Sequence, residues 1–107
     1  MSNNISMIRG DTLILRINIT PAILTADDIV RFTANRIRTS TGIVELTSDA
    51  VIIDDSSAII TIPPESTANL GIGGYNYDIR LRQATGEVHT LIARSIFFIL
   101  PEVTQFA

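Results

Sequence analysis

The chain has 107 residues and a formal net charge of −3 at pH 7, and it contains no cysteine. A chain of this length is typical of one domain, and the absence of cysteine excludes disulfide bonds and thiolate chemistry. All 8 basic side chains are arginines, so a mechanism based on lysine is excluded as well.

The same composition bears on where the protein works and on what it binds. An acidic protein lacks the basic surface that drives nucleic-acid binding, so we expect no nucleic-acid partner. The N-terminal sequence has neither the basic segment nor the apolar core of a signal peptide, and no apolar run approaches membrane-spanning length. We therefore expect synthesis in the cytoplasm and no association with a membrane.

The first half of the chain contains two segments in which apolar and polar residues alternate. These are residues 13–20 and residues 30–35. Alternation with period two is the signature of a strand with one buried and one exposed face. Arg36 and Arg38 fall where the apolar positions of the second segment should continue, which predicts a β-bulge or a strand that leaves the core. A hairpin loop is expected at residues 39–42.

The middle of the chain consists of short β-prone runs separated by turn residues. The sequence Asp-Asp-Ser-Ser at residues 54–57 favours a turn, because Asp and Ser side chains bond to nearby backbone groups. Residues 63–70 carry the signals of a helix, since prolines suit a first turn and a glycine follows the last residue. We predict a short helix there that carries the chain from one sheet to the other.

The plainest strand pattern lies in residues 74–82. Its apolar positions alternate strictly with polar ones, and they are Tyr75, Tyr77, Ile79 and Leu81. We interpret this segment as a central strand with both tyrosines in the core. Replacing either tyrosine by alanine should then cost roughly 3 to 5 kcal/mol of stability.

The last long β-prone run is residues 87–100, and its segment 96–100 is apolar on both faces. Such a strand is either fully buried or has one face that waits for a partner. Short strands separated by turns, without a repeated βαβ period, predict an all-β fold. We predict an immunoglobulin-like antiparallel β-sandwich of about seven strands, formed by residues 1–107 as one domain with short terminal arms. In such sandwiches a tyrosine, here Tyr75 or Tyr77, often ties down a corner through its hydroxyl.

Three short motifs have functional interpretations that compete with structural ones. Residues 9–11 form Arg-Gly-Asp, which integrins recognise, but their place before a strand favours a turn. His89 is the single histidine, and we expect it partly exposed on a strand; with no nucleophile elbow or metal motif in the sequence, we expect no enzyme and no cofactor. Five acids either bind calcium between loops or, as we favour, form turns, namely Asp27, Asp28, Asp49, Asp54 and Asp55.

The arginines mark a candidate interface. Arg80 and Arg82 share the outer face of the expected central strand, and Arg31 lies on the polar face of another strand. A solvated sheet face is one interpretation, and a protein-docking face is the other, because Arg is enriched at interfaces where Lys is depleted. The candidate interface residues are these three arginines together with the apolar Phe97, Ile99 and Phe106.

Several segments follow one another in an order that is typical of a known family. They are Gly10-Asp11-Thr12, Leu24-Thr25, Val30-Arg31-Phe32-Thr33, residues 63–71, residues 74–81, residues 86–91 and Pro101-Glu102-Val103-Thr104. The chain thereby resembles small immunoglobulin-like proteins encoded among the virion genes of tailed phages and is similar to the N-terminal domain of phage upper baseplate proteins. The resemblance covers nearly the whole chain, but its motifs are those of a fold and specify no site.

The resemblance implies a non-enzymatic structural or adaptor subunit of a phage virion, in the tail, baseplate, neck or capsid decoration. Its partners would be other virion proteins and copies of itself, with no small-molecule substrate. Its location would be the virion, after synthesis in the host cytoplasm. Neighbouring subunits would then hold the terminal arms, residues 1–8 and 104–107. The alternative is an adhesion or ligand-binding module that depends on carbohydrate or calcium.

Overall fold

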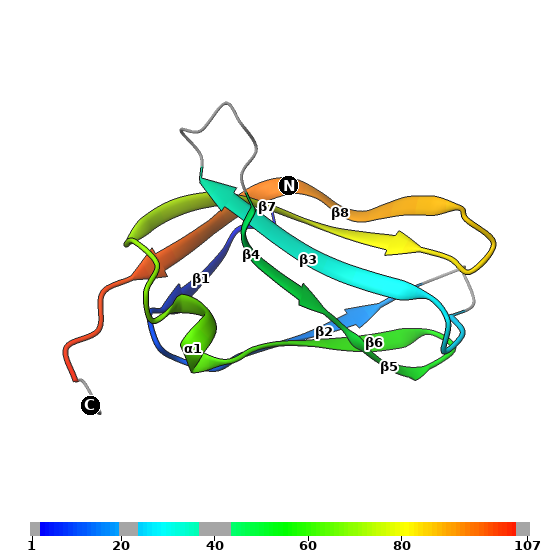
Figure 1. The fold of residues 1–107 in the computed structure, drawn as a ribbon, viewed down its shortest axis with the longest axis horizontal. Helices are drawn as coiled ribbons and strands as arrows, with labels where there is room; N and C mark the ends of the chain where they lie inside the picture. The colour runs from blue at the N-terminus through cyan, green and yellow to red at the C-terminus, as the bar shows by residue number, and fades with distance from the viewer. Residues whose placement is uncertain (1–2, 20–23, 37–43, 105–107) are drawn as a thin grey trace.

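The computed structural model describes residues 3–19, 24–36 and 44–104, and these form strands and one short helix in two layers (Figure 1). The elements are β1 (Ile5–Ile8), β2 (Leu13–Asn18), β3 (Ile29–Arg36), β4 (Val44–Asp49), β5 (Val51–Asp54), β6 (Ser57–Ile62), α1 (Pro64–Thr67), β7 (Gly73–Arg82) and β8 (Val88–Leu100). One sheet has the order β1-β8-β7-β3-β4, and the other has the order β2-β6-β5. The predicted β-sandwich is confirmed.

Two details differ from the expected sandwich. β1 pairs with β8 in parallel, whereas the other strand pairs of the described ranges are antiparallel. Residues 5–8 of the expected N-terminal arm are thus part of the five-stranded sheet, where the Met7 side chain is buried. A bulge near Arg36 was expected, and the register of β3 against β4 shifts between Ala34 and Asn35. Arg38 and the expected hairpin loop at 39–42 lie outside the described residues.

The predicted helix has the expected place but is shorter than expected. α1 spans four residues and connects β6 of the three-stranded sheet to β7 of the five-stranded sheet, so it carries the crossover. Pro64 lies in its first turn, where a missing N–H costs nothing. In the described part of the chain, no helix has the length and hydropathy needed to cross a membrane.

β7 is the middle strand of the five-stranded sheet, as the alternation at residues 74–82 predicts. Its inner side chains Tyr75, Tyr77, Ile79 and Leu81 are at most 1% exposed. The Tyr75 hydroxyl donates a hydrogen bond of 2.7 Å to the Gly71 carbonyl, which confirms the expected corner tie. The Tyr77 hydroxyl donates to the Asn3 carbonyl and so attaches the N-terminal segment. Burial raises the pKa of both tyrosines, so both hydroxyls remain protonated donors.

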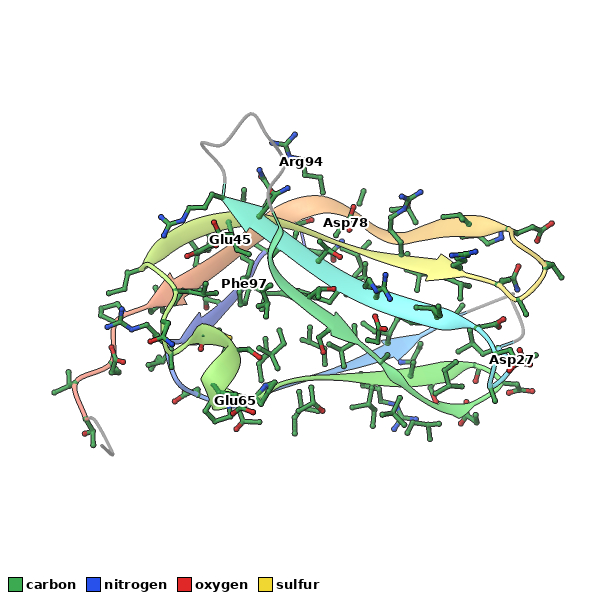
Figure 2. All side chains as sticks on the ribbon, in the orientation of Figure 1. Asp27, Glu45, Glu65, Asp78, Arg94 and Phe97 are labelled. Carbon is green, nitrogen blue, oxygen red and sulfur yellow. The ribbon has the colours of Figure 1, made fainter. Side chains whose placement is uncertain are left out.

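The assignment of Phe97 and Ile99 to the candidate interface is wrong. Both side chains are fully buried between the layers, where Figure 2 places Phe97. β8 pairs with β7 so that Phe97 lies opposite Tyr75, and directly opposite residues point to the same face of a sheet. Phe98 and Leu100 therefore point outward, with 40% and 43% of their surface exposed. Phe106, the third apolar candidate, lies outside the described residues.

Replacement of Tyr75 by phenylalanine tests the corner tie. Tyr75→Phe should lower the free energy of unfolding by about 1 kcal/mol, because the Gly71 carbonyl loses its donor while the ring stays packed. Tyr75→Ala removes the ring as well and should cost about 3 to 5 kcal/mol. Urea unfolding followed by circular dichroism measures both losses. Equal losses for the two variants would show that the ring contributes nothing beyond the hydroxyl.

Candidate functional site

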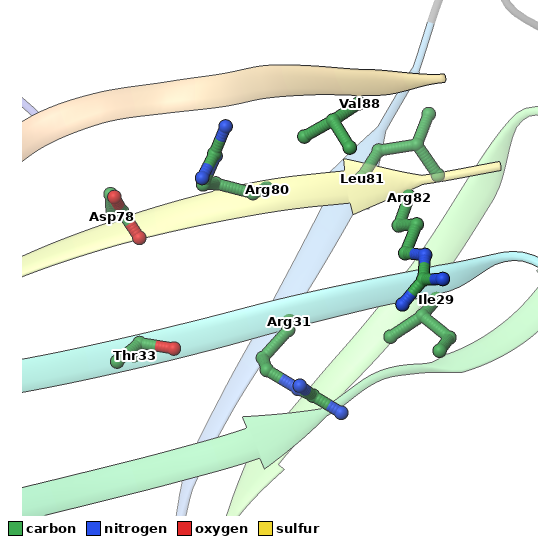
Figure 3. A pocket seen from close by; sticks show the side chains of 8 residues that line it. All are labelled: Ile29, Arg31, Thr33, Asp78, Arg80, Leu81, Arg82 and Val88. Atoms are coloured by element: carbon green, nitrogen blue, oxygen red, sulfur yellow. The ribbon is translucent and has the colours of Figure 1, made fainter. Parts of the chain in front are cut away.

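Arg31, Arg80 and Arg82 lie together on the outer face of the five-stranded sheet. Arg31 on β3 lies directly opposite Arg80 on β7, and Arg82 lies opposite Ile29. The inner positions of both strands carry buried apolar side chains, so the alternation of the strands places the arginines outside. They line a groove of about 330 Å³, which we call the arginine groove (Figure 3). Its other lining residues are Ile29, Thr33, Asp78, Leu81 and Val88.

The three guanidinium groups have different partners. Arg31 donates two hydrogen bonds to Asp49 of β4, from Nε at 2.5 Å and from a terminal nitrogen at 3.0 Å. These bonds lower the pKa of Asp49. Within the described residues, Arg80 and Arg82 have neither a hydrogen bond nor an ion pair. In Figure 3 the Arg80 side chain reaches toward β8, and that of Arg82 reaches toward Ile29 on β3.

The charges on this face are therefore only partly compensated. Like charges on directly opposite residues of two strands repel, so Arg31 and Arg80 destabilise the bare sheet face. Asp49 neutralises Arg31, and Asp78 adds one carboxylate two residues before Arg80. Asp49 could not be identified as this partner from the sequence, because its position opposite Arg31 depends on how β3 and β4 pair.

The groove also has an apolar side. Ile29 and Val88 line it and are 37% and 47% exposed. Two unpaired guanidinium groups beside exposed aliphatic side chains suit an anionic ligand that also carries apolar groups. The lining residues thus combine three cationic side chains, one carboxylate from Asp78, one hydroxyl from Thr33 and an apolar edge.

Two of the five acids considered as calcium ligands hold turns, whereas Asp49 lies on strand β4 and pairs with Arg31. Asp28 accepts hydrogen bonds of 2.9 Å from the backbone N–H groups of Thr25 and Ala84, and both bonds lower its pKa. Asp54 accepts from the Ser56 backbone and from the Ser57 hydroxyl, each at 2.9 Å. These bonds support the interpretation of Asp28 and Asp54 as turn formers, but that interpretation is wrong for Asp49, which is a strand residue.

The Arg-Gly-Asp tripeptide also forms a turn. Gly10 has a φ of 84°, which favours glycine, and the Asp11 N–H donates to the Ile8 carbonyl at 3.0 Å. The Arg9 guanidinium is bound to the Glu102 carboxylate at 2.8 Å. Because Arg9 is held in this way, the tripeptide is not displayed as an adhesion motif needs to be.

Metal donors are scattered over the described part of the chain. No group of three or more His, Asp or Glu side chains there is placed to hold a metal ion. His89 is exposed, as expected, and its Nε2 lies 3.7 Å from a Glu87 carboxylate oxygen. Met7 is buried in the core.

Comparisons with known proteins support the fold. No family model matches the chain, and no curated protein matches its sequence. Among solved structures, the crystal structure of CopC from Methylosinus trichosporium OB3b is similar, with a TM-score of 0.56. The superposition covers 96% of this chain and 89% of that chain at 12% sequence identity. At this identity the likeness shows a shared immunoglobulin-like β-sandwich.

The comparison contradicts the expected role in a phage virion. The similar structure belongs to CopC, a copper-binding protein, and nothing in these comparisons links the chain to phage baseplate proteins. The sequence signals that suggested a baseplate domain are signals of the sandwich fold, which proteins with unrelated functions share.

The pH dependence of stability tests the role of Asp28. Its pKa is lower in the folded chain than in the unfolded chain, so it contributes stability above the unfolded value that is lost as pH falls below about 4. Asp28→Asn should therefore lose less stability than the wild type between pH 5 and about 2.5. Asp27→Asn, an exposed neighbour at the same turn, is the matched control and should follow the wild type. Thermal unfolding across this pH range measures the difference, and parallel curves for Asp28→Asn and the wild type would contradict it.

Proposed function

We propose that the protein is a binding module that holds a carboxylate-bearing ligand, an acidic peptide segment, in the arginine groove. The observation that carries this proposal is the pair of guanidinium groups on Arg80 and Arg82, which have no partner among the described residues. They lie beside a third arginine in a protein whose net charge is −3. A local cationic site on an acidic protein is suited to a specific anion and not to polyanions in general.

The spacing of the two arginines favours an extended peptide. Arg80 and Arg82 are two residues apart on one face of β7, which corresponds to a separation of roughly 7 Å along the strand. Acidic residues at alternate positions of an extended peptide have the same spacing. Each guanidinium can bind one carboxylate through two parallel hydrogen bonds, an arrangement that lysine cannot provide.

The surroundings of the arginines disfavour nucleic acid as the ligand. Asp49 and Asp78 lie on the same face and would repel a continuous row of phosphates. Ile29 and Val88 offer apolar contacts that a peptide side chain uses and a phosphate backbone does not. An acidic peptide with apolar neighbours fits both features. In this proposal the protein is not an enzyme and has no cofactor.

Copper binding, which the likeness to CopC raises, does not fit the side chains of the described residues. Copper in proteins is bound by imidazole, thiolate and thioether groups. The chain has one histidine and no cysteine; of its two methionines, Met7 is buried in the core and Met1 lies outside the described residues. His89 and Glu87 form a pair, which falls short of the three or four ligands of a transition-metal site.

A peptide titration tests the proposed site. The probe is the capped tetrapeptide Glu-Val-Glu-Val, added at low ionic strength and followed by nitrogen–proton NMR spectra. Replacing both Arg80 and Arg82 by glutamine should weaken its binding at least about tenfold, because two charge-assisted contacts are lost. Arg94→Gln removes one positive charge from an exposed position outside the groove and should change the affinity less than about twofold.

Two results would contradict the proposed site. One is equal binding by the wild type and the Arg80→Gln, Arg82→Gln variant. The other is the absence of shifts on β7 at millimolar peptide. Unchanged circular dichroism of the double variant establishes that the fold is retained, since both side chains are exposed.

A copper titration tests the conclusion that the described side chains form no copper site. One equivalent of copper(II) at pH 7 should leave the melting temperature of the protein unchanged, because a ligand stabilises only the state that it binds. The measurement is thermal unfolding by circular dichroism, with His89→Asn as the matched variant. A rise of several degrees in the wild type that disappears in His89→Asn would contradict our exclusion of a copper site.

A further inference from the structure

The three-stranded sheet ends at β2 in an edge that has no partner in the described part of the chain. β2 lies first in the order β2-β6-β5 and pairs with β6 alone. All of its residues, Leu13 through Asn18, are in register with β6 without a bulge. Its backbone N–H and C=O groups on the other side form a row that can pair with a further strand.

The other sheet edges in the described ranges carry features that block such pairing. β8 extends beyond its contact with β1, and there its register against β7 shifts twice, between Tyr77 and Ile79 and between Ile79 and Arg80. β5 and β1 have four residues each, and β5 also has a register shift. β4 pairs with β3 through a shifted register, and its Ser48 hydroxyl donates to the Thr61 carbonyl of β6. A short strand or a bulge protects a sheet edge from pairing with another chain, and β2 has six residues and no bulge.

The side chains on the inner face of β2 are only partly buried. Leu13, Leu15 and Ile17 are partly exposed, whereas the inner side chains of the neighbouring strand β6, which are Ala58, Ile60 and Ile62, are fully buried. A groove of about 470 Å³ lies between β2 and β8, and its apolar lining residues are Ile17, Ile19, Leu91 and Ile92. A strand added to β2 would cover these side chains and remove apolar surface from water.

The charged side chain of β2 indicates which residues a partner strand at this edge would carry. Arg16 is the charged side chain of β2, it is exposed, and it has no hydrogen bond or ion pair within the described residues. It lies on the outer face together with Ile14, which is 64% exposed. An acidic residue opposite Arg16 would form a cross-strand charge pair, and apolar residues at alternate positions would cover Leu15 and Ile17.

A second copy of this chain fits the edge less well. Directly opposite residues of an antiparallel pair point to the same face, so two β2 strands related by a twofold axis have few possible registers. One register places Leu15 opposite Leu15 and Arg16 opposite Ile14, and the next places Arg16 opposite Arg16. Neither supplies an acid to Arg16, and the second brings two like charges together.

We propose that the β2 edge binds an extended segment of a partner protein, with apolar residues at alternate positions and an acidic residue opposite Arg16. The segment adds a fourth strand to the three-stranded sheet, with backbone hydrogen bonds providing affinity and Arg16 providing selectivity. This site lies apart from the arginine groove and does not depend on it.

The experiment uses the full chain with Arg80→Gln and Arg82→Gln, so that the arginine groove does not compete for the probe. The probe is the capped hexapeptide Thr-Val-Glu-Val-Thr-Val, and binding is followed by NMR shifts and amide hydrogen exchange. We expect shifts on β2 and β6 and slower exchange along β2. The same peptide with N-methyl groups at alternate residues should lose binding at least about tenfold, because it cannot pair with the edge.

A charge exchange tests the selectivity of Arg16. The charge-exchanged peptide is Thr-Val-Arg-Val-Thr-Val. Added to the Arg80→Gln, Arg82→Gln protein, Arg16→Glu should make it bind this peptide at least about threefold more tightly than the glutamate peptide. The protein that keeps Arg16 should prefer the glutamate peptide. Arg16→Gln is the matched neutral variant and should show no preference. Melting curves check that each variant is folded.

Three outcomes would overturn the proposal. The first is the absence of shifts on β2 at millimolar peptide, and the second is equal binding of the N-methylated peptide. The third is a dimer, detected by light scattering, in which β2 amides are protected without peptide. That result would assign the edge to a second copy of the chain.

Discussion

The packing of Phe32, Tyr77 and Phe97 between the two layers is the contact on which the arrangement of the five-stranded sheet depends. The ring of Phe32 is stacked on Tyr77 with centroids 5.1 Å apart and meets Phe97 edge-on at 5.5 Å. The rings come from β3, β7 and β8, so their packing fixes the register of three adjacent strands. A slip of one residue would place an aromatic ring in water and a charged side chain in the core.

The same constraint determines the outer face. Because residues of a strand alternate between faces, an inner face built from Phe32 and Tyr77 leaves Arg31, Arg80 and Arg82 outside. The arginines therefore gather on one surface as a consequence of core packing, and β4 supplies one neutralising carboxylate, that of Asp49. Among the described residues, the other two guanidinium groups of this face, those of Arg80 and Arg82, have no charged partner, whereas opposite charges on neighbouring strands usually pair.

Polar side chains hold the connections at both ends of the sandwich. Asp28 joins the turn at Thr25 to Ala84 in the β7–β8 connection, at the end where Figure 2 shows Asp27. At the other end, Arg9 bonds to Glu102 and the Gly10 N–H donates to the Thr67 hydroxyl at 2.9 Å. The bonds to Asp28 and to Thr67 satisfy backbone N–H groups that the sheets leave unpaired, and the bond between Arg9 and Glu102 joins two side chains. The β2 edge has no comparable cover in the described part of the chain.

β1 was not predicted from the sequence, which placed residues 5–8 in a terminal arm. The sequence alone predicted the other strands, the central place of residues 74–82, the crossover after residue 63 and the outward direction of the arginines. Each of these follows from local periodicity or turn chemistry, which a single strand or turn expresses without its neighbours. The sequence could not assign the two faces of residues 96–100, because apolar residues occupy both, and the pairing of Phe97 with Tyr75 decided that Phe97 and Ile99 are core residues. Strand register also decided that Arg31 faces Arg80 and Asp49, and sheet order decided that β2 lies at an edge without a second partner strand among the described residues. These features belong to pairs of strands distant in sequence, and only the folded chain specifies which residues of such strands meet.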